Sequence, residues 1–248
     1  NICLYAYDDI ASNIFNPYKG QIFHSIDHKL NVYPGSSSIN YKGDEVNSQG
    51  FYDSISKLPT TESDYVFIYY DNHGGPGTLG TPDFFDIIEG NELSNSFNIA
   101  VERRLYKQCL FIIEACYSGS VAELINASNL AIITAANAHE SSYSAIYDEE
   151  IGTYLSNEFT NYFISIIDEN PSITVGELFL YLQKNTEQSH VCFYGDESIQ
   201  SISLSKFIGI PTKVLSLKVD KTNLKSVKPR VATEKSLKFL SKHPKASI

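Results

Sequence analysis

Four short runs of apolar residues stand out along the chain. They are "ICLYAY" (2–7), "YVFIYY" (65–70), "CLFII" (109–113) and "LAIITAA" (130–136). Each run is continuous rather than alternating, which is typical of strands covered on both faces of a parallel sheet. The pattern therefore predicts buried parallel strands at these positions.

Segments with helical character separate the apolar runs, and they lie after Asn47 and at about 91–106, 118–126, 150–168 and 174–187. The last of them opens with Thr174-Val-Gly-Glu177, the pattern of a helix capping box. Two further strands are expected at 190–194 and 199–204. Because strands alternate with helices, we expect an α/β fold: a doubly wound, mostly parallel sheet with helices on both faces.

Composition agrees with an ordinary globular protein. With 248 residues, 42% of them hydrophobic and 19% charged, the chain can bury one sizeable core. No apolar run approaches the roughly 18 residues that a membrane span needs, so no membrane span is expected. No signal-peptide pattern is visible in the given sequence.

Charge is distributed unevenly between two parts of the chain. Residues 1–212 hold nine Lys or Arg against 27 acidic residues, a balance of −18, whereas 213–248 have a balance of +8. An acidic body argues against nucleic acid as the main partner. The helix and strand pattern fades after about 212, which we take as the boundary between a folded domain (1–212) and a basic tail (213–248). The tail is either a solvated end or a segment that docks on its own acidic body.

The cysteines are Cys3, Cys109, Cys116 and Cys192, too few and too scattered for a disulfide framework. Cys3 and Cys109 lie within apolar runs, and both are expected in the core. No C-x-x-C pattern occurs, and no metal and no cofactor is predicted.

Polar residues follow three of the apolar runs at the point where each run ends. Asp8 follows the first, His73 and three glycines the second, and Cys116 the third. Functional sites of doubly wound sheets lie beyond the carboxyl ends of the strands, so a Cys/His pair at one sheet edge is predicted. Backbone amides near Gly74 could then approach a reacting carbonyl. Taken singly, a His before glycines also suits a plain turn, and a Cys after an apolar run suits packed core.

Glu114 ends the third run between Ile113 and Ala115. A buried carboxylate is costly unless it is paired or hydrogen-bonded. Glu114 is therefore either an outward-facing residue at the end of the strand or part of a polar pocket that recognises a substrate side chain.

Several segments together resemble the legumain family of asparaginyl endopeptidases, which are cysteine peptidases with a caspase-like fold. The strongest are "YYDNHGGPGTLG", "FIIEACYSGS" and "AANAHESSYSAIYDEEIGTYL". The segments "YAYDDIA", "NVYPG", "YKGDEV" and "SHVCFYGD" add to the likeness, which covers most of 2–210.

The resemblance implies an endopeptidase that cleaves after Asn. Cys116 would attack the scissile carbonyl, His73 would handle protons, and the backbone amides of Gly74 and Cys116 would hold the oxyanion. Glu114 and Ser142 would line the S1 pocket, which receives the substrate Asn. Cleavage after Asp is expected at low pH, where a protonated carboxyl resembles an amide.

Four departures from the family pattern accompany the resemblance. Asn72 stands where the family has Asp before its His, and Asn157 stands where an Asp lines the S1 wall, one negative charge fewer. The family also begins with a strand–helix unit that would precede residue 1, so the resemblance implies a chain truncated at its N-terminus. Residues 213–248 are shorter than the family's C-terminal helical prodomain, and we hypothesise that this basic tail docks on the acidic body and inhibits it.

Two other functions stay open. The catalytic subunit of GPI-anchor transamidase belongs to a related group that shares the His and Cys motifs, and an inactive fragment or binding module would follow if the first strand is truly missing. The resemblance further implies a lysosomal, vacuolar or secreted location and protein substrates that contain Asn.

Overall fold

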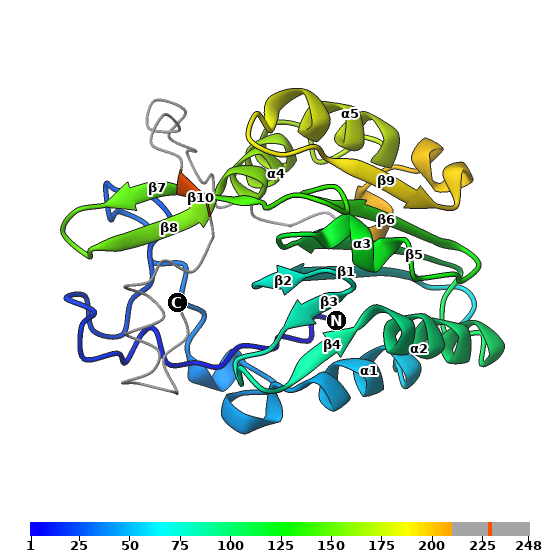
Figure 1. Ribbon diagram of the computed structural model, residues 1–248, viewed down its shortest axis with the longest axis horizontal. Coiled ribbons are helices and arrows are strands. Elements are labelled where there is room, and N and C mark those ends of the chain that lie inside the picture. Colours follow the sequence, from blue (N-terminus) through cyan, green and yellow to red (C-terminus); the bar gives the residue numbers. More distant parts are fainter. Residues whose placement is uncertain (210–227, 230–248) are drawn as a thin grey trace.

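The computed structural model describes residues 1–209 and 228–229. Its centre is a four-stranded sheet in the order β1-β5-β6-β9 (Figure 1). The strands are β1 (Tyr65–Asp71), β5 (Gln108–Glu114), β6 (Leu130–Thr134) and β9 (Cys192–Gly195). The first three are parallel and β9 runs antiparallel to β6. The strands expected at 65–70, 109–113, 130–136 and 190–194 are therefore confirmed.

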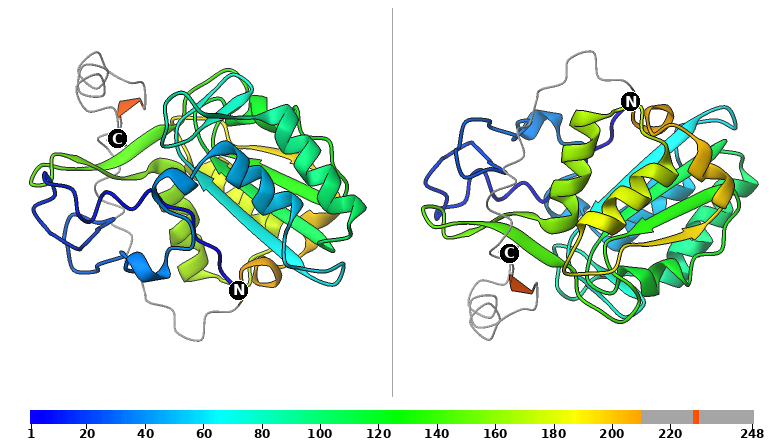
Figure 2. Two further views of the ribbon diagram at one scale, coloured as in Figure 1. Left: turned by 90° about the horizontal axis from the view of Figure 1, so that it is seen from below. Right: turned by 90° about the horizontal axis from the view of Figure 1, so that it is seen from above.

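Helices cover both faces of this sheet (Figures 1 and 2). On one face lie α1 (Ser48–Ser56), α2 (Gly90–Glu102) and α3 (Ser118–Ala122). On the other lie α4 (Glu158–Glu169), α5 (Val175–Asn185) and the short α6 (Ser205–Ile208). The expectation of a mostly parallel sheet with helices on both faces is confirmed.

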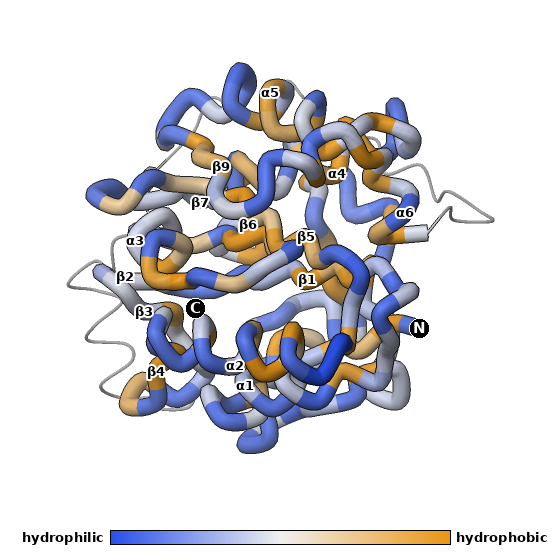
Figure 3. Tube along the Cα trace, turned by 90° about the vertical axis from the view of Figure 1, so that its right-hand side faces the viewer, coloured by the Kyte–Doolittle hydropathy of each residue, from blue (hydrophilic) through white to orange (hydrophobic). Residues whose placement is uncertain are grey.

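Strand β5 lies at the centre of the core. Phe111 and Ile113 pack toward α1 and α2, whereas Leu110 and Ile112 pack toward α4 and α5. Figure 3 shows the hydrophobic strands between the two helical layers. Burying one such side chain stabilises the fold by about 1.5–3 kcal/mol. Because β5 buries these side chains on both of its faces, the core fixes the position of the strand. Cys109 belongs to this core, as expected, and its burial raises the pKa of the thiol.

Two helix starts follow from capping residues in the sequence. The Asn47 side chain accepts a hydrogen bond from the backbone N–H of Gly50 at 2.8 Å and begins α1. Thr174 and Glu177 form the expected capping box at the start of α5, with the backbone N–H of each bonded to the other's side chain. Both predictions are confirmed.

The helix expected at 150–168 starts late, because a β-hairpin occupies its first part. Strands β7 (Tyr143–Asp148) and β8 (Thr153–Asn157) pair antiparallel, and α4 begins only at residue 158. Asp148 closes the turn: its carboxylate accepts the N–H of Ile151 and its carbonyl accepts the N–H of Gly152. Gly152 has a φ of 78°, a conformation that favours glycine.

The strand expected at 2–7 is wrong. Only Tyr5 makes an isolated bridge, to Tyr41, and the two rings stack with centroids 4.3 Å apart. Ile2 is 90% exposed and Cys3 is also exposed, so the expectation that Cys3 lies in the core is wrong too. The backbone groups of this segment bond to the loop around Tyr41 instead of to a strand of the main sheet. An apolar run forms a buried strand only where a sheet edge accepts it.

The strand expected at 199–204 is also wrong, because a 3-10 helix, η3 (Glu197–Ser201), occupies this region. The Asp196 side chain accepts the N–H of Ser198 and starts that turn. A small antiparallel sheet that the pattern did not predict follows β1 directly. It consists of β2 (Gly74–Gly75), β3 (Thr78–Gly80) and β4 (Ile87–Glu89).

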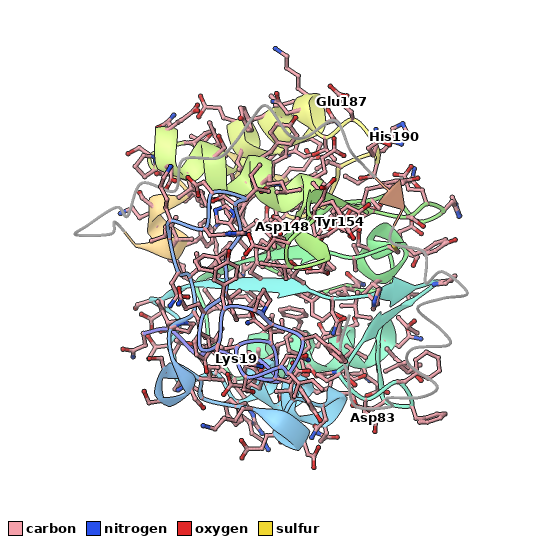
Figure 4. The ribbon with its side chains drawn as sticks, turned by 90° about the vertical axis from the view of Figure 1, so that its left-hand side faces the viewer. Lys19, Asp83, Asp148, Tyr154, Glu187 and His190 are labelled. Carbon is pink, nitrogen blue, oxygen red and sulfur yellow. The ribbon has the colours of Figure 1, made fainter. Side chains whose placement is uncertain are left out.

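The N-terminal segment is fastened to the β7–β8 hairpin through His28. Its Nε2 lies 2.6 Å from Asp148, and its Nδ1 lies 2.9 Å from the hydroxyl of Tyr18, which donates to Glu150. Figure 4 shows the N-terminal trace, in blue, reaching Asp148. The contact between His28 and Asp148 joins residues that lie 120 positions apart in sequence.

The basic tail lies largely outside the described residues, and so does the boundary expected at 212. Its described part is β10 (Lys228–Pro229), which pairs antiparallel with β7 opposite Tyr143 and Ser144. Within the described part of the chain, no helix has the length and hydrophobicity needed to cross a membrane.

Candidate active site

The register of β1 and β5 brings the predicted Cys/His pair to one edge of the sheet. Asp71 and Glu114 are direct partners in this parallel pair, and the N–H of Asn72 donates to the carbonyl of Glu114 at 3.3 Å. His73 and Cys116 each lie two residues beyond these partners. The two side chains therefore start from equivalent positions on adjacent strands; their catalytic roles stay a prediction.

Gly74 lies directly against the backbone of Cys116. A Cβ atom on Gly74 would be 2.3 Å from the carbonyl oxygen of Cys116 and 2.9 Å from the Cβ of Ala115. No side chain fits at such distances, so the close approach depends on glycine. The segment after His73 and the segment around Cys116 thus meet in space although 42 residues separate them in sequence.

The backbone of His73 is held by the hairpin of β2 and β3. Its carbonyl accepts the N–H of Gly80 at 2.8 Å and the hydroxyl of Tyr70 at 3.1 Å. Tyr70 also donates to the carbonyl of Gly80 at 2.6 Å. The His73 side chain is exposed. A proton-transfer residue must lie within hydrogen-bond reach of the proton it takes, and these bonds fix the backbone from which the His73 side chain extends.

The thiol of Cys116 lies in a tight turn between β5 and α3. The residue is 5% exposed, and its Sγ lies 3.7 Å from the carbonyl oxygen of Ser142, a weak hydrogen bond. Tyr117 has a φ of 56° and donates its N–H to the carbonyl of Glu140 at 2.7 Å. The loop after β6 therefore positions the turn that carries the thiol.

Ser120 joins the two loops. Its hydroxyl accepts the N–H of Gly77 at 2.7 Å and donates to the carbonyl of Tyr117 at 2.6 Å. The loop of His73 and the turn of Cys116 are thereby connected by a side chain as well as by the Gly74 contact.

Glu140 is a positioning residue that the sequence pattern did not reveal. Its Oε1 accepts the N–H of Asn137 at 2.9 Å and that of His190 at 2.6 Å, and its Oε2 lies 2.8 Å from Nδ1 of His190. Burial pushes its pKa up, but the hydrogen bonds from Asn137 and His190 outweigh burial and hold the pKa below its ordinary value. The charged carboxylate fixes the loop on which Tyr117 and Cys116 depend.

Replacing Glu140 by Gln is expected to destabilise the fold at neutral pH by about 1–3 kcal/mol, because charge-assisted hydrogen bonds are lost. The folded-state pKa is depressed, so this stabilisation is present above the ordinary pKa of 4.5 and is lost as pH falls through the lower, folded value. Urea unfolding at pH 7 and near pH 3 measures both states. The difference from the unmodified chain should shrink at the acidic pH.

Glu187→Gln is the matched control, because this exposed carboxylate lies in the segment next to His190 (Figure 4). Its charge repels the carboxylate of Glu158, so the variant should leave stability unchanged or slightly higher at pH 7, the opposite sign to Glu140→Gln. A Glu140→Gln effect equal to that of the control, or one independent of pH, would contradict the positioning role.

The expected pocket residues are buried at the same end of the sheet. Glu114 is 0% exposed, Ser142 1% and Asn157 4%. Ser142 directly precedes β7 and approaches Cys116 through its carbonyl, and Asn157 ends β8. The Nδ2 of Asn157 donates to both carboxylate oxygens of Asp71, at 3.0 and 2.9 Å. Asp71 is a further pocket candidate that the sequence did not single out.

A model of the Peptidase C13 family matches residues 1–210 of the chain. The chain is similar to legumain of Mus musculus (31% identity, covering 87% of this chain and 52% of that protein). It is also similar to hemoglobinase of Schistosoma mansoni (33%, 82% and 49%) and to GPI-anchor transamidase of Saccharomyces cerevisiae (29%, 77% and 49%). It spans about half the length of these relatives. The solved structure of caspase-1 from Spodoptera frugiperda matches with a TM-score of 0.43 and 12% identity, over 58% of this chain and 65% of that one.

Proposed function

The chain belongs to the Peptidase C13 family, and we propose that it is a cysteine endopeptidase that cleaves peptide bonds after Asn. The observation that carries the proposal is the meeting of the His73 loop with the Cys116 turn, where Gly74 lies against the Cys116 backbone. His73 follows β1 and Cys116 follows β5, and these strands are adjacent and parallel, so the two residues lie at the same edge of the sheet.

In the proposed reaction, His73 takes the proton of the Cys116 thiol, and the thiolate sulfur attacks the scissile carbonyl carbon. The carbonyl oxygen becomes an oxyanion, which the backbone amides of Gly74 and Cys116 stabilise. The imidazolium gives its proton to the leaving amine as the C–N bond breaks. Water then attacks the thioester, His73 accepts a proton from it, and the acid product leaves with the thiol restored.

The pocket supports a polar substrate side chain. Glu114, Ser142 and Asn157 provide carboxylate, hydroxyl and amide groups within a buried region next to Cys116. A carboxamide both donates and accepts hydrogen bonds, and a site with such buried groups rejects side chains that leave them unpaired. We therefore propose Asn, and protonated Asp at low pH, as the residue before the cleaved bond.

Fluorogenic peptides that differ only in Asn, Asp or Ala before the scissile bond test the proposal on residues 1–248. Turnover should be highest with Asn. A peptide chloromethyl ketone ending in Asn should alkylate Cys116, as mapped by mass spectrometry. A folded chain with no turnover and no label at Cys116 would favour a binding module over a peptidase.

A second candidate is transfer of the acyl group to an amine, supported by the similarity to GPI-anchor transamidase over 77% of this chain. The same acyl-enzyme would form, and an amine would replace water in the second step. Adding an amine nucleophile such as hydroxylamine or a glycyl peptide, and measuring the ratio of ligated to hydrolysed product, distinguishes the two functions.

We also propose that the basic tail inhibits the enzyme. Strand β10 pairs with β7 opposite Tyr143 and Ser144, next to Ser142, on an edge that an extended peptide could use. Residues 213–248 carry a balance of +8 against −18 in residues 1–212, so attraction favours docking at neutral pH and low salt.

A chain ending at Pro211 is expected to show a KM about five- to tenfold lower at pH 7 than the full chain. The difference should fall in high salt and near pH 4, where carboxylates of the body become protonated. A chain ending at Arg230 retains β10 and should stay inhibited. Identical KM values and pH profiles for all three chains would contradict inhibition by the tail.

A lysosomal, vacuolar or secreted location is part of the proposal. Its support is the family and the triplet Asn126-Ala-Ser128, in which Asn126 is exposed after α3. If the chain follows that route, the protein from its native cells should lose mass on treatment with an N-glycosidase, and Asn126→Gln should abolish the change.

A further inference from the structure

Asp71 and Asn157 form a fixed pair at the edge of the predicted pocket. Asn157 is 4% exposed, and its Nδ2 donates to both oxygens of Asp71 at 3.0 and 2.9 Å. A carboxylate only accepts hydrogen bonds, so the amide nitrogen faces Asp71. The contact joins residues 86 apart in sequence and sets the direction of the Asp71 carboxylate.

The same carboxylate lies beside Glu114. Asp71 and Glu114 are direct partners across β1 and β5. Two residues earlier, Tyr69 and Ile112 both belong to the cluster that packs against α4 and α5. Because side chains alternate along a strand, Asp71 and Glu114 point to this face as well. The two carboxylate side chains therefore extend from neighbouring backbone positions, and Asp71 is an exposed residue whereas Glu114 is buried.

Ser142 gives an independent sign of a ligand near this pair, because it lies two residues before Ser144, the partner of Asn157 across β7 and β8. Its hydroxyl oxygen is buried and has no hydrogen-bond partner among the described residues, while its carbonyl lies 3.7 Å from the Cys116 thiol. A buried hydroxyl without a partner is costly, and a polar ligand would satisfy it. The polar groups of these residues are thus two carboxylates that accept hydrogen bonds, the Ser142 hydroxyl and the Asn157 amide.

We propose that Asp71 is a specificity-determining residue of the S1 pocket and that Asn157 is its positioning residue. The Asp71 carboxylate accepts an N–H of the substrate carboxamide and repels a substrate carboxylate, so the pocket selects Asn against Asp at neutral pH. Asp71 thereby supplies a charged acceptor whose direction the Asn157 amide helps to fix. The proposal rests on the peptidase function and deepens it.

Turnover of matched Asn and Asp peptides at pH 7 tests the proposal. Asp71→Asn should lower kcat/KM for the Asn peptide about tenfold and reduce the Asn-over-Asp ratio about tenfold. The double variant Asp71→Asn/Asn157→Asp exchanges the two groups and should restore the ratio to within about threefold. Asp64→Asn removes the same charge at the opposite end of β1, roughly 23 Å away, and should leave the ratio unchanged. An Asp71→Asn ratio equal to that of this control overturns the proposal.

Binding to protein carrying Cys116→Ala separates this proposal from the peptidase function. Fluorescence polarisation gives the Kd of labelled Asn and Asp peptides with and without Asp71→Asn. If the unmodified chain shows no turnover but binds the Asn peptide more tightly, and Asp71→Asn removes that preference, the pocket assignment stands and the peptidase function fails. If neither peptide is preferred, or the preference survives Asp71→Asn, the pocket assignment is overturned.

Discussion

Cys116→Ala is expected to lower kcat/KM for an Asn peptide by about four orders of magnitude or more, because no nucleophile remains to form the thioester. His73→Ala should cause a similar loss, since the two residues act as a unit and their effects do not add. Removing one sulfur from a turn held by backbone bonds to Glu140 should leave the melting temperature within a few degrees. Steady-state kinetics and thermal unfolding together measure both effects.

Cys192→Ala is the matched control. This thiol is half-buried on β9, where burial raises its pKa and makes it a poor nucleophile. The variant should retain turnover. Activity that survives Cys116→Ala but disappears with Cys192→Ala would show that Cys192 is the nucleophile and would contradict the proposed mechanism.

The adjacency of the two loops could be predicted because its signals are local. Continuous apolar runs identified β1, β5 and β6, and polar residues directly after the first two identified the sheet edge. The carboxyl ends of parallel strands lie at the same edge of a sheet. Once two such strands are neighbours, the residues directly after them, here His73 and Cys116, are expected to lie near each other. The close approach of Gly74 agrees with the glycines noted after His73.

The contacts that shape the pocket could not be predicted in this way. Asn157 was expected within a helix, whereas it ends the hairpin strand β8, because the turn at Gly152 depends on one left-handed residue. Its bond to Asp71 and the bond of Glu140 to His190 join residues 86 and 50 positions apart. Such pairs leave no periodic signal, since each depends on how separate elements pack.

The segment 2–7 shows the opposite error. Its apolar pattern is as continuous as that of β5, yet its backbone bonds to the loop around Tyr41 and Ile2 stays exposed. Hydrophobicity indicates which segments could be buried, but a strand also needs a neighbour that supplies hydrogen-bond partners.

Gly74→Ala is expected to reduce kcat/KM by about 100-fold or more and to destabilise the fold by about 1–3 kcal/mol. The added Cβ would lie 2.3 Å from the carbonyl oxygen of Cys116, so the two loops must separate. A separation near 1 Å moves the imidazole and the proposed oxyanion amide away from the thiol, and losing one oxyanion donor alone costs about 100- to 1,000-fold. Kinetics with the Asn peptide and urea unfolding measure the two losses.

Gly75→Ala distinguishes this contact from a general need for glycine in the loop. Its Cβ would meet only the Oγ1 of Thr78, at 3.3 Å, and a side-chain hydroxyl can rotate away where the Cys116 carbonyl cannot. Gly75→Ala should therefore keep activity within about threefold, because a terminal rotamer change costs little. If both variants lose activity equally, the glycines serve the flexibility of the loop, and the direct contact between Gly74 and the Cys116 backbone is not what aligns the pair.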